Sequence, residues 1–155
     1  MILLYLAITA VTFVAMEGIT WLTHKYIMHG LLGWYFHEDH HQPGYPHVFE
    51  KNDFFFVVFA IPCMILFYLG TVGGITWLAF LAAGVLLYGI CYFLVHDVLI
   101  HRRFKWFDKV DHWYFRGLRK GHKIHHKHLG KEDGECFGML YVPKKYFIEA
   151  RKTRK

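Results

Sequence analysis

Apolar residues fill two long stretches of the chain. Residues 1–23 carry one charged side chain, Glu17, and residues 54–95 contain no Asp, Glu, Lys, Arg or His. At ~1.5 Å per residue, a helix over 54–95 would be roughly 60 Å long, which is two crossings of a ~30 Å hydrocarbon core. The glycines in 70–74 predict a tight turn midway, and Pro62 predicts a kink in the helix before it. The pattern therefore predicts an all-α integral membrane protein with about three transmembrane spans.

The remaining segments are polar enough to lie outside the membrane. They form a loop over 24–53 and a tail after Val95. Apolar residues recur at helical spacing over 106–118, which predicts an amphipathic helix that either lies on the membrane or packs as an ordinary helix of a cap. Residues 130–138 predict a loop. We expect a single membrane domain, 1–155, with a histidine-rich, metal-binding cap.

Basic residues are distributed unevenly about the spans. Lys25 and Lys51 lie between the first two spans, and the other sixteen Lys and Arg residues all follow Val95. Since basic residues favour the cytoplasmic side, we expect the N-terminus outside and the loop and tail in the cytoplasm. The first apolar run lacks the basic start of a secretory signal peptide, so we expect it to be retained. No organellar transit segment precedes it, which favours a prokaryotic cell (inner) membrane.

The net charge of +6 favours anionic membrane lipids over nucleic acid as the partner, because the basic residues flank the spans. The three cysteines form no C-x-x-C pair, and two lie within apolar spans. We therefore expect no disulfide framework.

Ten of the thirteen histidines fall into one pattern that occurs twice. Each copy is a His-x4-His pair followed by a His-x2-His-His triplet, and each begins where an apolar run ends. The two copies consist of His24, His29, His37, His40 and His41, and of His96, His101, His122, His125 and His126. Three spans place both copies on the same side of the membrane. We therefore predict a metal cluster at the membrane surface, with these ten imidazoles as its ligands.

Helical geometry predicts how the imidazoles divide between ions. Adjacent residues such as His40 and His41 are ~100° apart around an α-helix and diverge. An α-helical His-x4-His pair is rotated by ~140° and displaced by ~7.5 Å. Both spacings favour two neighbouring ions. Ten donors exceed the four ligands of a structural zinc site, and the paired Glu-x-x-His motifs of carboxylate-bridged di-iron bundles are absent.

Imidazole binds iron, zinc, copper and nickel, so the ligands alone leave the metal open. Position narrows the chemistry, because metals at the ends of apolar helices are placed to act on a lipid-soluble substrate. This placement favours oxygen activation over hydrolysis of a soluble substrate.

Some polar residues near the motifs have two interpretations. Glu17, seven positions before His24, is either a functional carboxylate or an acid that snorkels or is hydrogen-bonded internally. Three carboxylates adjoin the ligand motifs and are candidates to accept the second ring N–H of a ligand: Glu38, Asp39 and Asp97. Three histidines lie outside the motifs and are expected not to bind the metal directly: His47, His112 and His128.

Three segments resemble the bacterial β-carotene hydroxylases, members of the membrane fatty-acid hydroxylase superfamily. They are HKYIMHGLLGWYFHEDHH (24–41), HDVLIHRRF (96–104) and GHKIHHKHLGKEDGECFGMLYVP (121–143). The histidine pattern alone is shared with membrane desaturases, sterol oxidases and carotenoid ketolases. The residues around it, especially HEDHH and FGMLYVP, are similar to those of the carotenoid 3-hydroxylases.

The resemblance implies a β-carotene 3-hydroxylase, a non-haem di-iron monooxygenase that converts β-carotene through β-cryptoxanthin into zeaxanthin. It implies two iron ions, O2 as co-substrate, a carotenoid taken from the bilayer, and electrons from a reductase system through ferredoxin or a similar donor. All ten patterned histidines carry over as iron ligands, while His128 has no assigned role.

The alternatives are another histidine-box oxygenase (a ketolase, lipid hydroxylase or desaturase) and a non-catalytic metal-binding or transport protein. Transport is disfavoured, since residues 54–95 offer no charged or histidine ligand at mid-membrane.

Overall fold

The computed structural model describes residues 1–42, 49–107 and 109–152, and over these residues it contains helices and no strand. Three helical segments are long and apolar enough to cross a membrane: Ile2–Met28, Lys51–Thr71 and Thr76–Ile100. The expectation of an all-α membrane protein with three spans is confirmed.

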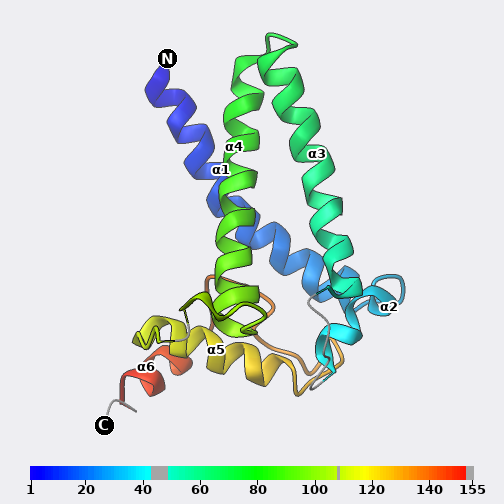
Figure 1. The fold of residues 1–155 in the computed structure, drawn as a ribbon, viewed down its shortest axis with the longest axis vertical. Coiled ribbons are helices and arrows are strands. Elements are labelled where there is room, and N and C mark those ends of the chain that lie inside the picture. The colour runs from blue at the N-terminus through cyan, green and yellow to red at the C-terminus, as the bar shows by residue number, and fades with distance from the viewer. Residues whose placement is uncertain (43–48, 108, 153–155) are drawn as a thin grey trace.

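The membrane part consists of α1 (Ile2–Leu22), α3 (Phe54–Thr71) and α4 (Thr76–Tyr92). Figure 1 shows α3 and α4 as an antiparallel hairpin, with its turn and the N-terminus at one end of the molecule and α2, α5 and α6 at the other. In the turn, Gly74 has a φ of 75°, a conformation that glycine adopts without strain. The turn expected over 70–74 is thus present, and Pro62 lies inside α3.

Small residues let α4 approach α1 closely. A Cβ atom at Gly84 would lie 2.6 Å from both the Cβ of Thr12 and the carbonyl oxygen of Thr9. The hydroxyl of Thr9 donates to the carbonyl oxygen of Phe80 (2.8 Å). Close backbone approach and interhelical hydrogen bonds replace the hydrophobic effect inside a bilayer, where lipid tails are as apolar as the side chains. This packing fixes the relative positions of the two helices that lead into the histidine motifs.

The cap is built from short elements at the opposite end from the hairpin turn. These elements are α2 (Trp34–His37), η2 (Asp39–His41), η3 (Lys51–Asp53), η5 (Lys105–Phe107), α5 (Trp113–His125) and α6 (Lys144–Lys152). The helices α5 and α6 pack together. Their core contains Leu118, Met139, Val142 and Tyr146. The chain over 130–138 forms neither helix nor strand, as expected.

The bounds predicted for the tail helix, 106–118, are wrong. Residues 105–107 form a separate 3-10 turn, and α5 begins only at Trp113. The imidazole of His112 accepts the backbone N–H of Tyr114 (3.3 Å) and so caps the start of α5. Leu118 is fully buried, which supports the interpretation of α5 as a packed helix of the cap.

Candidate metal centre

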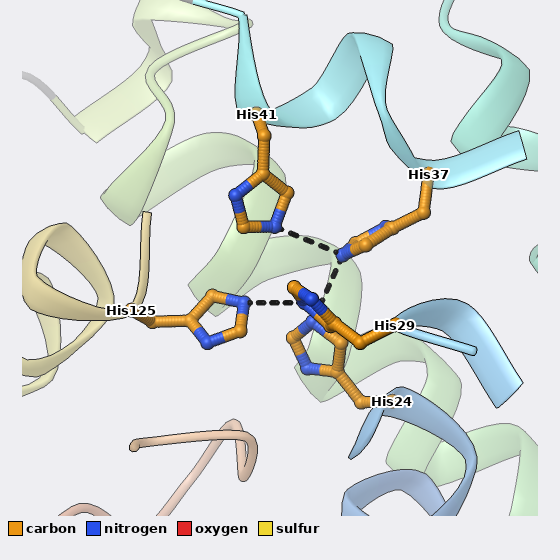
Figure 2. Close-up of side chains that lie close together, drawn as sticks. All are labelled: His24, His29, His37, His41 and His125. Carbon is orange, nitrogen blue, oxygen red and sulfur yellow. Dashed lines mark hydrogen bonds between the residues drawn. The ribbon is translucent and has the colours of Figure 1, made fainter. Parts of the chain in front are cut away.

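The ten patterned histidines converge where the membrane helices meet the cap. Nine of them form two groups, each with its ligand atoms within 4.8 Å of one another. The first group contains His24, His29, His37, His41 and His125, which point toward a common centre in Figure 2. The second group contains His40, His101, His122 and His126. The tenth, His96, adjoins the second group, with its Nε2 3.0 Å from Nε2 of His40.

Each copy of the motif contributes one imidazole to the other copy's group. His40, the middle histidine of the first triplet, belongs to the second group, and His125, the middle histidine of the second triplet, belongs to the first. Their chain neighbours His41 and His126 stay with their own copies. Adjacent histidines thus diverge into different groups, as predicted, and the exchange ties the two motif copies into one cluster.

The prediction that a His-x4-His pair would diverge is wrong. The rings of His24 and His29 have centroids 5.2 Å apart, and those of His96 and His101 are 4.5 Å apart. The reason is that both pairs lie on π-helical segments, η1 (Thr23–Met28) and η4 (Phe93–Ile100), which continue α1 and α4.

The backbone bonds of these segments confirm the wider turn. The N–H of His29 donates to the carbonyl oxygen of His24 (3.1 Å), and that of His101 to His96 (2.8 Å). Such i to i+5 bonds widen the turn, so that residues five apart lie on the same face. Single π-helical turns of this kind are rare in proteins, and those that occur are often found at functional sites.

Several imidazoles turn Nε2 inward and donate outward through Nδ1. In the first group, the Nδ1–H groups of His24, His29 and His125 donate to the backbone carbonyl oxygens of Phe137, Leu129 and Glu135, at 3.0, 2.9 and 3.2 Å respectively. A carbonyl oxygen can only accept, so each of these bonds fixes the ring proton on Nδ1. The Nε2 atoms of these three rings therefore carry lone pairs.

Two such lone pairs face each other between His29 and His125, whose Nε2 atoms are 3.2 Å apart. Burial lowers the pKa of His29 and lowers that of His125 to about 2, so neither ring is protonated at neutral pH. Facing lone pairs repel, and a cation bound by both removes that repulsion. With metal–nitrogen bonds of ~2.1 Å, two nitrogens on one ion lie roughly 3.0–3.4 Å apart. The donor set of the first group therefore fits a transition-metal ion.

Five more of the patterned histidines are also neutral donors. Burial, reinforced by neighbouring imidazoles, lowers the pKa of His126 to about 4 and those of His40, His101 and His122 well below their usual range. Burial likewise lowers the pKa of His37 to about 3. Metal ligation by imidazole requires the neutral form, so burial prepares these side chains to bind.

Two side chains that orient ligand candidates lie outside the histidine motifs and were not predicted. Asn52 Oδ1 accepts the Nδ1–H of His37 (2.7 Å), and Glu50 Oε2 accepts that of His40 (2.8 Å). Both lie in or beside η3, 15 and 10 positions after their histidines in the chain. The only available signal was the run of polar residues just before the second span.

The three carboxylates suggested from the sequence have different partners. Asp97 Oδ1 lies 3.2 Å from Nδ1 of His96, as proposed. Asp39 instead accepts the backbone N–H of Lys51 (2.6 Å) and so holds η3 in place. Glu38 pairs with the Lys51 ammonium at the surface.

The histidines outside the motifs take no part in either group over the described residues. His112 caps α5, and His128 is exposed. His47 lies outside the described residues.

Arg103 connects η3 to η4. Its guanidinium donates to both oxygens of Asp53 (2.9 Å each) and to Asp97 Oδ1 (2.8 Å). The bridge therefore links the turn that orients His37 to the carboxylate beside His96.

A cavity of about 350 Å³ lies between α1, α3 and α4 at the cap end. Its wall is mostly apolar, with Phe55, Phe59 and Val85 among the lining residues, while Asn52 and Asp97 line its polar side. Both polar residues are hydrogen-bond partners of patterned histidines. A mostly apolar cavity with a few polar groups, of roughly 300–1,000 Å³, is typical of small-molecule sites.

Comparison with known proteins finds a family and close relatives. Residues 9–143 match the fatty acid hydroxylase family. The chain is 44% identical to a β-carotene hydroxylase of Pantoea ananas over 137 residues (88% of this chain and 76% of that protein). It is 42% identical to that of Pseudescherichia vulneris (92% and 80%) and 40% identical to that of Paracoccus sp. strain PC1 (88% and 83%). No solved structure matches the chain.

The Arg103 bridge should contribute more stability than a surface ion pair. Replacement Arg103→Ala leaves the carboxylates of Asp53 and Asp97 without their shared cation, and the Asp97 side chain is only 11% exposed. We expect the free energy of unfolding in detergent to fall by about 1–3 kcal/mol. The matched control Lys51→Met removes the exposed pair with Glu38 and should cost less stability than Arg103→Ala. Equal losses in the two variants would contradict the bridging role.

Proposed function

The chain belongs to the fatty acid hydroxylase family, and we propose that it is a β-carotene hydroxylase that acts on carbon 3 of the β-ionone rings. Its relatives named β-carotene hydroxylase are 36–44% identical over most of the chain. The observation that carries the proposal is the position of the histidine groups, which lie beside a largely apolar cavity at the ends of the membrane helices.

The ten patterned histidines are proposed as the ligands of two iron ions. The division of nine of these histidines into two groups supports a total of two ions. When bound, the iron pair would supply the activation of O2 that insertion into an unactivated C–H bond requires. The protein contributes neutral, oriented imidazoles, because Asn52, Glu50 and the backbone carbonyls of the cap fix which ring nitrogen faces inward.

The overall reaction needs an external source of electrons. One oxygen atom of O2 replaces a ring C–H by C–OH, and the other leaves as water, which consumes two electrons and two protons per hydroxylation. Ferredoxin or a similar donor of a reductase system is proposed to supply them. Three exposed basic residues support a donor with a negatively charged surface, because each directly follows a histidine of the second group in the chain: Arg102, Lys123 and Lys127.

The cavity is proposed to hold one ring end of the carotenoid. Its volume of about 350 Å³ suits a substituted cyclohexene ring, and the polyene chain would extend into the lipid. Phe55, Phe59 and Val85 would pack on the ring and exclude water. The cap is proposed to face the cytoplasm at the inner membrane, which the basic residues of the cap support.

Pigment analysis tests the proposed reaction. In bacterial cells that accumulate β-carotene, the native chain should produce β-cryptoxanthin and zeaxanthin, as measured by chromatography. His122→Ala should abolish both products, because it removes a proposed ligand, while the exposed His128→Ala should produce them normally. Keto-carotenoids would instead identify a ketolase. If β-carotene stays unchanged although the protein has bound iron and a competent electron donor is present, the proposal is contradicted.

Metal content tests the ligand assignment. We expect the purified native protein to contain two iron ions per chain, one for each group. His125→Ala should lower the content toward one, because that histidine belongs to the first group, whereas His128→Ala should retain two. The measurement is the amount of iron per mass of purified protein. Two ions in His125→Ala would refute its assignment as a ligand.

Filling the cavity should reduce activity without loss of iron. A Cβ at Gly89 would meet no atom within 4 Å, and Gly89 lines the cavity. Gly89→Leu should therefore fold and bind iron but lower hydroxylation roughly 10- to 100-fold, because it displaces the ring from its reactive position. Leu87→Phe adds bulk to an exposed side chain of the same helix and should leave activity unchanged. Full activity of Gly89→Leu would place the substrate elsewhere.

A further inference from the structure

Glu17 is a carboxylate inside the first membrane span that binds a distant segment of the cap. Its Oε1 accepts the backbone N–H groups of three consecutive residues, Met139, Leu140 and Tyr141, at 2.8, 2.9 and 3.1 Å. Its Oε2 accepts the hydroxyl of Tyr88 on α4 (2.7 Å). Consecutive N–H groups that converge on one oxygen form an anion-binding concavity. The interpretation of Glu17 as an internally hydrogen-bonded acid is thus confirmed. Its partners are the backbone of 139–141 and the hydroxyl of Tyr88.

The bound segment is continuous with the chain that orients the first histidine group. The carbonyl oxygens of Glu135 and Phe137, which accept from His125 and His24, lie just before Met139 in the chain. Together with Leu129, this stretch supplies the Nδ1 partners of three of the five imidazoles in the group. Any shift of this backbone would move these acceptors and release the rings.

The segment needs an external constraint to keep its shape. Cys136, between the two residues whose carbonyl oxygens accept these bonds, has a φ of 63°, in the left-handed region that residues other than glycine rarely adopt. Such a conformation persists only where the surroundings impose it. On the other side, a Cβ at Gly138 would lie 2.7 Å from Glu17 Oε1. The segment therefore fits closely around this carboxylate.

We propose that Glu17 is a positioning residue for the first histidine group, through the backbone of 135–141. This inference rests on the proposed function, because it assumes that the group binds iron. In the second group's surroundings, His40 and His96 are instead oriented by the carboxylates of Glu50 and Asp97. Loss of Glu17 should therefore disturb one iron and spare the other, which a general loss of stability would not do.

Mössbauer spectroscopy of protein loaded with 57Fe tests the proposal, because inequivalent irons give separate doublets. His125→Ala identifies the doublet of the first group. In Glu17→Ala, we expect that doublet to be lost, with iron content falling from two toward one per chain. In Glu17→Gln, an amide oxygen can still accept the three N–H groups, so we expect two irons with only the first doublet shifted. Val14→Ala, an exposed position on the same helix, serves as the matched control and should resemble the native protein.

The outcomes separate this inference from the proposed function. A native protein that binds no iron would remove the premise and overturn both. If both Glu17 variants keep the two doublets of the native protein unchanged, the positioning role alone is overturned. Equal perturbation of both doublets would also overturn it, since it would indicate a general structural effect. If Glu17→Ala is not recovered from membranes, the selective shift in Glu17→Gln decides the question.

Discussion

Inward-facing imidazole nitrogens are the constraint around which the cap is organised. Nε2 atoms from different elements lie 2.7–3.2 Å apart, and where carbonyl acceptors hold the ring protons on Nδ1 these atoms present facing lone pairs. Burial also disfavours protonation of the rings outside the membrane segments, so the facing lone pairs of His29 and His125 repel unless a cation lies between them. The groups behind the rings oppose that repulsion before a metal binds. These are backbone carbonyls of the 129–137 stretch, Asn52 and Glu50, and they are held in turn by Glu17, Asp39 and Arg103.

The membrane helices reach this cluster through their π-helical ends. An α-helical continuation of α1 would turn His24 and His29 ~140° apart, and only one of them could face the cluster. The widened turns η1 and η4 align both members of each His-x4-His pair, and the close packing of α4 on α1 at Gly84 sets the distance between the two turns. The geometry of the histidine cluster thus depends on contacts made between the membrane helices.

The sequence predicted what depends on periodicity and composition, and it failed where tertiary contacts decide. The three spans, the turn at Gly74 and the divergence of His40 from His41 follow from helical geometry and apolar run length. The π-helical turns could not be predicted in this way, because they arise where side chains from four separate segments converge. Asn52 and Glu50 were missed for the same reason, since their partners lie 15 and 10 positions away. The start of α5 at Trp113 depended on a histidine cap that hydrophobic spacing does not register.

The two copies of the motif look alike in sequence, yet their surroundings differ. Neutral backbone carbonyls orient His24, His29 and His125 in the first group, whereas carboxylates orient His40 and His96 at the second. A carboxylate partner makes an imidazole a more basic donor than a carbonyl does, and the second group is also the more exposed of the two. The cavity contacts both environments, because Asn52, a partner of His37, and Asp97, a partner of His96, both line it. A sequence repeat has therefore produced two chemically distinct histidine groups, because the residues that make them differ lie outside the repeat.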